Sequence, residues 1–573
     1  MQPVVAVRGR ALFWALLALT VSTRLAVALA DHRSLIGNDV YQDDAFYYLR
    51  IASNVVHGRG LTFDSAAPTN GFHPLYFLLL LPIAAASGSN LALPIHLSAI
   101  ALTAVAAATG AALYGFLARL ASRGVALFGL LLWAIGPYFI LMGVNGLETG
   151  VATVFVILVP SLYLSWFHDA GDRRPDAKRA LAFGAVCGLA LLARIDLALL
   201  LAAIALVALA RGGRNTGRSL ATPALVGAGL AAVWLPWLAV SYAATGHVLP
   251  LSGAASRQIA LNFGWLNLQP IWSHVAPDQM VFDPAHVPAA YRLDVATKLA
   301  ATFLFENPLL APARATVPAS PWAELPDYLP YRFLLSNPPL AVVLGLLILV
   351  PVIIIVRRRL PARPDDANRP KLQALRRLVV LYLLFTAVGY TFYAPVHWYF
   401  NRYLVPAILL TTVWALVELP RFLSGRRARA IVLGLGIAIT ACQLAEARFF
   451  ARLRWTDTPP SGFLASWYAL GAGVDPQARI GAFQAGIYGY FSGRDIINLD
   501  GKVNQDAFAA VRDHRLHAYA RAQGVRYVLD VEWMLQTFWL RHAPPGSVSY
   551  RRVGGTGGSR VQLFEIIDRT PQP

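Results

Sequence analysis

Charged side chains are scarce in this sequence. Only 14% of its 573 residues are charged, whereas 57% are hydrophobic. Ordinary globular chains contain about 25% charged residues and at most about 50% apolar residues. The shortage of charge therefore excludes a typical water-soluble protein. Because apolar stretches long enough to cross a bilayer core of roughly 30 Å recur along the chain, we expect an integral membrane protein.

Cysteine and nucleotide-binding glycine patterns are also in short supply. The only two cysteines, Cys187 and Cys442, lie in apolar stretches, where cysteine packs as a small apolar residue. This arrangement excludes a disulfide framework and a cysteine metal site. The glycines between Gly481 and Gly486 lack the spacing of a phosphate-binding loop, which excludes a nucleotide site there.

Acidic residues are outnumbered by basic ones, 30 to 49, which gives a net charge of +19. The basic residues collect in short loops between apolar stretches, as is typical of cytoplasmic loops. The main clusters are Arg357–Arg359 with Arg363, Arg376 with Arg377, and Arg421 with Arg426, Arg427 and Arg429. We therefore expect no nucleic-acid partner, and binding of lipid headgroups is the remaining alternative for these clusters.

The basic loops predict a multi-pass chain with a cytoplasmic N-terminus and an external C-terminal region. The first apolar segment is expected to be a retained signal-anchor, with Arg24 snorkelling to the outer surface. The stretch from His73 to Ala86 is too short to span and is predicted to be a re-entrant or interfacial helix. About eleven spanning helices fit this topology: 11–30, 91–117, 124–142, 150–167, 181–193, 197–210, 220–242, 336–356, 378–395, 403–420 and 430–448.

The membrane domain is predicted for residues 1–448 and includes two external loops, 31–90 and 243–336. A small extracytoplasmic α/β domain is predicted over 449–573. Its strands are predicted at Arg479–Phe483, Asp495–Leu499 and Val525–Leu529, with a helical stretch over Asp506–Ala522.

The first external loop carries the clearest chemical signal. Asp43 and Asp44 open an aromatic, helix-compatible run that includes Tyr47 and Tyr48. A carboxylate held at a membrane surface can act as a general base toward a hydroxyl group. The alternative is that Asp43 merely caps the helix that begins near Ala45, with Asp44 on its first turn.

The run DDAFYYLRIASNVVHGRGLTFD, followed by PTNGFHPLYFLLL, resembles the first external loop of the C-type (GT-C) glycosyltransferase superfamily. Members are multi-pass enzymes that use polyprenyl-phosphate sugars, and they include protein O-mannosyltransferases, aminoarabinose transferases and arabinofuranosyltransferases. The acidic pair of that loop corresponds to Asp43 and Asp44, with an Asp as the base. The His73-Pro74 pair resembles the element that opens the next helix. The motif does not assign a subfamily.

The resemblance implies a GT-C fold and inverting transfer of a hexosyl or pentosyl group. The sugar donor would be a polyprenyl phosphate in the membrane lipids, and the acceptor a lipid, a glycan or a protein. For the leaving phosphate, arginine is the best-suited side chain. Further elements match less specifically, and the resulting assignments are Arg402, Arg194 and His73 for phosphate, and Tyr47, Tyr48, Asn70, Glu148 and Tyr403 for substrate.

Several alternatives stay open at this point. Arg402 is either a phosphate ligand or an interfacial arginine, and Arg194 is equally suited to pair with Asp196 between two short helices. No dedicated metal-ligand cluster is visible, so we predict no cofactor, although Asp43, Asp44 and Glu148 offer oxygens for a divalent cation. A transporter or a non-catalytic scaffold of cell-envelope assembly is the alternative function. The Ala- and Arg-rich composition favours a bacterial inner membrane, with the site facing the periplasm.

Overall fold

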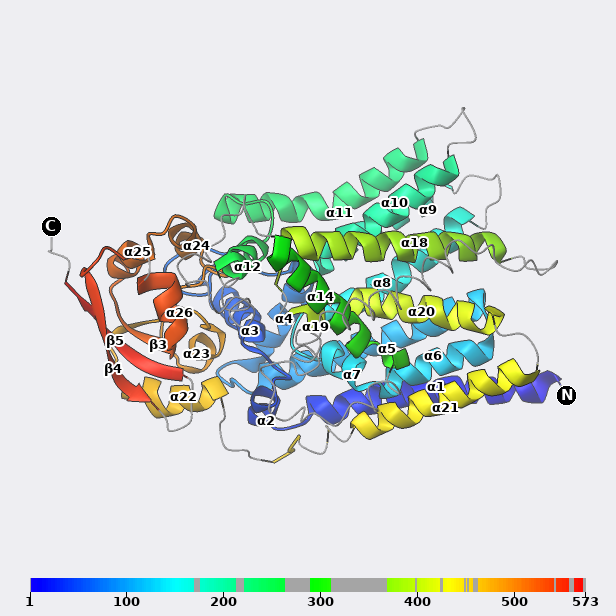
Figure 1. Cartoon of the computed structure of the whole chain (residues 1–573), viewed down its shortest axis with the longest axis horizontal. Helices are drawn as coiled ribbons and strands as arrows, with labels where there is room; N and C mark the ends of the chain where they lie inside the picture. The colour runs from blue at the N-terminus through cyan, green and yellow to red at the C-terminus, as the bar shows by residue number, and fades with distance from the viewer. Residues whose placement is uncertain are drawn as a thin grey trace.

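The computed structural model describes residues 2–168, 176–212, 221–262, 289–310, 368–396, 399–422, 426–447, 450, 453–456, 462–540, 543–555 and 561–569. Figure 1 shows long helices lying along the long axis of the molecule, with a small sheet-containing part at one end. We call this part, from residue 462 onward, the C-terminal domain.

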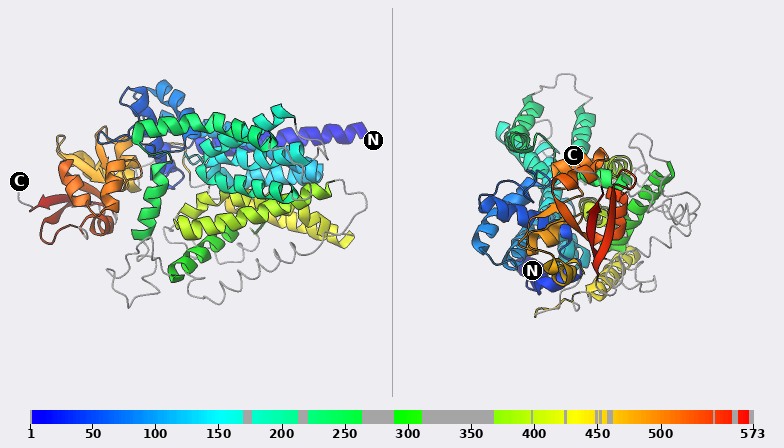
Figure 2. Two further views of the ribbon diagram at one scale, coloured as in Figure 1. Left: turned by 90° about the horizontal axis from the view of Figure 1, so that it is seen from above. Right: turned by 90° about the vertical axis from the view of Figure 1, so that its left-hand side faces the viewer.

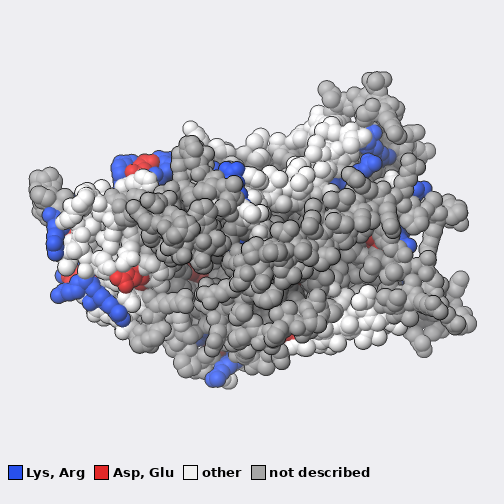
Figure 3. All heavy atoms as spheres, in the orientation of Figure 1, with Lys and Arg blue, Asp and Glu red and all other residues white. Residues whose placement is uncertain are grey.

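The long helices form the membrane part of the chain. Five of the described helices are long and apolar enough to cross a membrane, and a bent pair makes a sixth crossing if counted as one. In the face shown in Figure 3, the described charged side chains lie mostly toward the two ends, and the described residues on the flank between are largely uncharged. The described helices of this part, whether or not they are long enough to cross a membrane, are α1 (Gln2–Ala28), α5 (Leu93–Leu120), α6 (Arg123–Ile135), α7 (Pro137–Gly143), α8 (Thr149–Tyr163), α9 (Ala177–Ala193), α10 (Ala198–Gly212), α11 (Ala221–Thr245), α18 (Arg369–Val388), α20 (Val405–Phe422) and α21 (Arg426–Glu446).

These bounds agree with most of the predicted spans. The total of about eleven crossings and the orientation of the chain stay predictions, and the expected span 336–356 lies outside the described residues. The break between α9 and α10 is confirmed, because Arg194 adopts an extended backbone and residues Ile195–Leu197 form a single 3-10 turn. Shorter helices complete this part: α2 (His32–Gly37), α3 (Asp43–Val56), α4 (Pro74–Ser87), α12 (Leu251–Asn262), α14 (Ala289–Glu306) and α19 (Phe400–Tyr403).

The expected single helix over 124–142 is wrong, because the chain bends by 64° between α6 and α7. Pro137 disfavours helical geometry at the preceding residue, and Gly136 is accordingly extended. Arg24 is fully buried beside this bend and donates to the Trp133 carbonyl at 2.9 Å and the Phe139 carbonyl at 3.4 Å. The prediction that Arg24 snorkels to the surface is therefore also wrong, because its guanidinium donates hydrogen bonds to backbone carbonyls at the bend.

The helix after the His-Pro pair is short, as predicted. Pro74 occupies the first turn of α4, where its missing N–H costs nothing. With 14 residues, α4 extends about 21 Å, which is less than the bilayer core.

The C-terminal domain is built on a five-stranded sheet in the order β2-β1-β3-β5-β4. The neighbours β1–β2 and β1–β3 are parallel, and the other two pairs are antiparallel. Figure 2 shows the domain over the end of the helices where the first loop lies. Its elements are α22 (Gly462–Leu470), β1 (Arg479–Ala482), α23 (Gly486–Phe491), β2 (Ile496–Asn498), α24 (Gln505–Arg512), α25 (Leu516–Ala522), β3 (Val525–Val531), α26 (Glu532–Met534), β4 (Val548–Gly555) and β5 (Val561–Asp568).

Three predicted strands are found at β1, β2 and β3. The predicted helical stretch over Asp506–Ala522 is divided into two helices, because His514 between them has φ +56°, outside the helical region. Strands β4 and β5 were not expected from the sequence. In β4 most side chains are exposed or half-buried, so it lacks the alternating apolar signal of a strand.

The first loop and the C-terminal domain share one apolar core. Phe46 and Tyr47 of α3 belong to the same cluster of buried side chains as Ile480 of β1 and Tyr488 of α23. Two glycines allow the backbones to meet: a Cβ at Gly71 would lie 2.0 Å from the Lys502 carbonyl oxygen, and one at Gly486 would lie 2.1 Å from the Asp43 carbonyl oxygen. The two parts are therefore fitted closely together.

A methyl group at either glycine should force these two parts apart. We expect Gly71→Ala and Gly486→Ala each to lower the stability by about 1–3 kcal/mol, the usual effect of overpacking, and to lower the melting temperature measured in detergent. Gly473→Ala is the matched control, because nothing lies within 4 Å of its added Cβ. Melting temperatures equal to that of the control would contradict the close fit.

Candidate active site

Asp43 opens α3 and points into the C-terminal domain. Its carboxylate accepts N–H bonds from Gly486 at 3.1 Å and Ile487 at 2.8 Å, the first amides of α23. The N-cap of α3 itself is Gln42, which makes no side-chain capping bond. The alternative that Asp43 caps its own helix is therefore wrong. Its carboxylate instead joins the first loop to the C-terminal domain.

Asp44 is held by two cations from different parts of the chain. Its carboxylate lies 2.5 Å from a terminal nitrogen of Arg402, at the end of α19, and 3.3 Å from the ammonium nitrogen of Lys502, after β2. Lys502 also donates to the Tyr399 hydroxyl at 2.7 Å and lies 3.6 Å from Asp500. We call Asp44, Arg402 and Lys502 the carboxylate–cation cluster.

Lys502 was missed by reasoning from the sequence. A signal for it exists, because Asp500-Gly501-Lys502 directly follows a predicted strand of an α/β domain. The carboxyl ends of parallel strands are where such domains place their ligand-binding residues.

The pKa values of the two neighbouring carboxyls, Asp43 and Asp44, are shifted in opposite directions. Burial raises the pKa of Asp43 to about 6, against the lowering effect of the Ile487 amide and with the charge of Asp44 adding to it. Burial also acts upward on the pKa of Asp44, but Lys502 and Arg402 more than offset it and hold that pKa below its usual range. At neutral pH, Asp44 is thus firmly ionised, whereas Asp43 titrates close to physiological pH.

His73, Tyr48 and Glu148 form a second group beside the cluster. The Tyr48 hydroxyl donates to Glu148 at 2.9 Å and accepts from the His73 backbone N–H at 3.0 Å. Burial lowers the pKa of His73, opposed by the charge of Glu148, so the imidazole is neutral at pH 7. His73 Nδ1 and Arg402 Nε are buried without a hydrogen-bond partner among the described residues. Two polar atoms are therefore left for a ligand.

Arg194 is occupied within the protein. Two of its nitrogens contact the Asp196 carboxylate at 3.0 and 2.5 Å, and the third donates to the Arg402 carbonyl at 3.2 Å. The side chain of Tyr403 lies between the two arginines, with its ring centre 5.2 Å from the Arg194 guanidinium and 5.4 Å from that of Arg402. Of the two open alternatives for Arg194, the geometry favours the structural partner of Asp196, and it positions Arg402.

Tyr47 and Asn70, predicted to bind substrate, hold backbone instead. The Tyr47 hydroxyl accepts the Ala485 N–H at 3.2 Å in the C-terminal domain. The Asn70 amide donates to the His247 and Leu249 carbonyls and accepts from the Leu251 N–H, which fixes the turn after α11. Both side chains are buried, and both position the loop.

The oxygens considered for a divalent cation have other partners. Asp43 accepts backbone amides, Asp44 contacts two cations, and Glu148 accepts from Tyr48. Across the described ranges, no three His, Cys, Asp or Glu side chains are placed to hold a metal ion. This donor set does not fit a resident metal.

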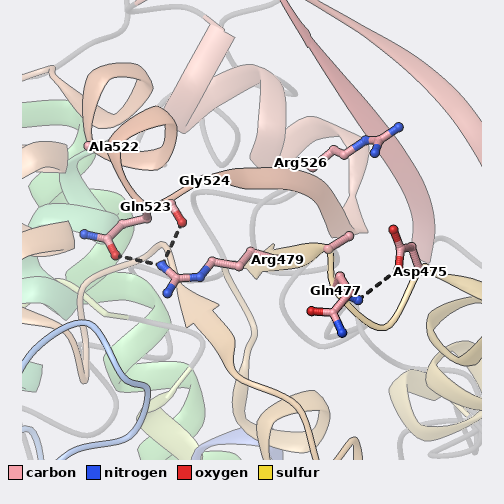
Figure 4. A pocket seen from close by; sticks show the side chains of 8 residues that line it. Asp475, Gln477, Arg479, Ala522, Gln523, Gly524 and Arg526 are labelled. Atoms are coloured by element: carbon pink, nitrogen blue, oxygen red, sulfur yellow. Dashed lines mark hydrogen bonds between the residues drawn. The ribbon is translucent and has the colours of Figure 1, made fainter.

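A separate hollow of about 450 Å³ lies on the C-terminal domain, at the amino ends of β1 and β3 (Figure 4). Arg479 on its wall donates to the Gln523 carbonyl at 2.8 Å, and Arg526 lies across from it. The carboxylate–cation cluster lies beyond the opposite, carboxyl ends of the parallel strands, so this hollow is not part of it.

Two solved structures are similar to this chain at low sequence identity. The chain is similar to an oligosaccharyltransferase from Archaeoglobus fulgidus, at 15% identity and a TM-score of 0.44, over 91% of this chain and 69% of the other. It is also similar to ArnT from Cupriavidus metallidurans bound to undecaprenyl phosphate, at 12% identity and a TM-score of 0.43, over 97% and 99% of the two chains. Both are members of the GT-C superfamily, which the first loop resembles.

Comparison by sequence matches only a part of the chain. A family described as "Domain of unknown function (DUF8728)" matches residues 460–564, which run from just before α22 into β5. No curated protein matches the chain. The roles of individual residues therefore follow from their own contacts.

The raised pKa of Asp43 makes the stability of the contact between the first loop and the C-terminal domain depend on pH. A carboxyl whose folded pKa lies above its unfolded value of 3.8 contributes stability below about pH 4, and this is lost as pH rises through about 6. We expect wild type to lose about 1–3 kcal/mol relative to Asp43→Asn between pH 4 and 7, because the amide cannot ionise. Melting temperatures of both proteins across this range measure the difference.

The stability of wild type is compared with that of Asp43→Asn at each pH because burial also raises the pKa of Asp530 to about 7 and that of Asp64 to about 6. Both groups are present in wild type and in the variant, and the charge of Asp43 adds to the raised pKa of Asp530 in wild type only. Asp475→Asn, on the exposed surface, is the control and should follow wild type. A constant difference between Asp43→Asn and wild type over this range would contradict the assignment.

Proposed function

We propose that this chain is a GT-C glycosyltransferase that moves a sugar from a polyprenyl-phosphate donor to a lipid, glycan or protein acceptor at the outer face of a bacterial inner membrane. One observation carries the proposal. The carboxylate of Asp44 meets the guanidinium of Arg402, at the end of the helix bundle that the C-terminal domain covers. A base and an anion-binding group therefore lie within reach of one substrate.

The reaction needs both groups at once. The acceptor hydroxyl oxygen attacks the anomeric carbon, and the bond from that carbon to the phosphate oxygen breaks with its electron pair on the phosphate. The hydroxyl proton passes to a carboxylate. The configuration inverts, and the charge that develops on the phosphate is stabilised by a preorganised cation.

The contacts support the following roles. Arg402 is 7% exposed and its Nε–H has no partner among the described residues, so it is the first choice for the phosphate, with neutral His73 beside it. Asp44 is the better-placed base, because Asp43 faces the amides of α23. Asp43 is then a positioning residue. Tyr48 donates to Glu148, and the ring of Tyr403 contacts the Arg402 guanidinium.

Asp44→Asn should lower transfer by about 10²-fold or more, because the amide cannot accept the acceptor proton. The measurement is transfer of label from a panel of polyprenyl-phosphate sugars by the full chain in proteoliposomes. Asp43→Asn should lower transfer less and should show the altered pH dependence of stability given above. Asp475→Asn serves as the control. Unchanged transfer in both the Asp43→Asn and Asp44→Asn variants would rule out this function.

A further inference from the structure

Lys502 reaches the cluster from a turn that is fixed in place. The Lys502 N–H donates to the Asp500 carboxylate at 2.9 Å, and the Gly501 N–H donates to the Asn498 side chain at 3.0 Å. Gly501 has φ +81°, which favours glycine, and the Lys502 carbonyl lies against Gly71 of the first loop. The backbone of Lys502 is thus held, while its four-carbon side chain keeps rotational freedom at its end.

The Lys502 ammonium lies in a nearly closed space. Its side chain is 12% exposed, and the carboxylate that it shares with Arg402 is 16% exposed. Asp44, Asp500 and Tyr399 face it directly. The other titratable groups that act on Asp44 and its partners are Asp43, Glu148, Tyr47 and Tyr403.

This arrangement sets a condition for catalysis. A carboxylate that contacts two cations is a poor proton acceptor, because both cations stabilise its anion. For Asp44 to take a proton from an acceptor, at least one cation must turn to another anion. The phosphate of the sugar donor is such an anion.

We propose that Lys502 is a second ligand of the donor phosphate, supplied by the C-terminal domain, and that Asp44 occupies the place of this phosphate until the donor binds. The proposal rests on the proposed function. Binding of the phosphate draws Lys502 and Arg402 away from Asp44 and releases it as the base. After transfer, Asp44 carries the acceptor proton; once it has passed this proton to the leaving phosphate or to water, its carboxylate competes for the same cations and promotes release of the polyprenyl phosphate.

The test measures binding, not turnover. Undecaprenyl phosphate without a sugar is titrated into the full chain in phosphatidylcholine nanodiscs. If Asp44 competes with phosphate, Asp44→Asn should bind about tenfold more tightly than wild type, even though it loses transfer. Lys502→Gln should bind about tenfold more weakly, and Lys502→Arg should stay within about threefold of wild type.

A double variant and a control separate this effect from a general loss of structure. In Asp44→Asn combined with Lys502→Gln, the gain in affinity should largely disappear, because the two groups act on each other. Asp475→Asn should bind like wild type. Asp44→Asn binding no tighter than wild type would overturn the proposal, and this arm decides even if Lys502→Gln fails to fold.

Three further outcomes each have one meaning. Phosphatidylglycerol competing as well as undecaprenyl phosphate would overturn the assignment to the donor. If wild type transfers sugar but Asp44→Asn gains no affinity, only the exchange of cations fails. If Asp44→Asn gains affinity but wild type transfers no sugar from any polyprenyl-phosphate donor, the exchange stands and the glycosyltransferase function fails.

Discussion

Two neighbouring carboxylates, Asp43 and Asp44, lie half-buried between the first loop and the C-terminal domain, and the rest of the site depends on how each is neutralised. Asp43 and Asp44 repel each other, and burial disfavours the charge of both. The C-terminal domain solves this by offering two amides of α23 to Asp43 and the Lys502 ammonium to Asp44. Arg402 completes the neutralisation from the helix bundle. The domain is therefore a structural part of the site.

The helix bundle supplies the other half of the site by rigid support. Arg194 donates hydrogen bonds to Asp196 and to the Arg402 carbonyl, and the Tyr138 hydroxyl donates to the neighbouring Asn401 carbonyl. The short α19 that carries Arg402 is thereby fixed at its backbone, while Arg402 Nε has no hydrogen-bond partner among the described residues. The backbone of Lys502 is held as well, and its ammonium contacts Asp44, Asp500 and Tyr399. Such a site is preorganised for an anion.

Reasoning from the sequence found more of the bundle than of the site. Long apolar runs predict helices because each run has one environment, lipid or a packed neighbour. The broken pair at Arg194 was predictable because charges are costly at mid-membrane. In contrast, Gly136-Pro137 was read as part of a straight helix, and Arg24 as a surface residue, because the carbonyls at a bend cannot be located before the bend is known. Strand β4 escaped because its apolar pattern is weak.

The sequence alone determined that the chain is a membrane protein and pointed to the acidic first loop and Arg402 as candidates for its chemistry, because hydrophobicity and residue type are local properties. The tertiary structure alone decided which carboxylate meets the cations. It also turned Tyr47, Asn70 and Arg194 into positioning residues and brought in Lys502, which lies 458 residues from Asp44 along the chain. Contacts over such separations depend on how two folded parts fit, and no local pattern encodes that fit.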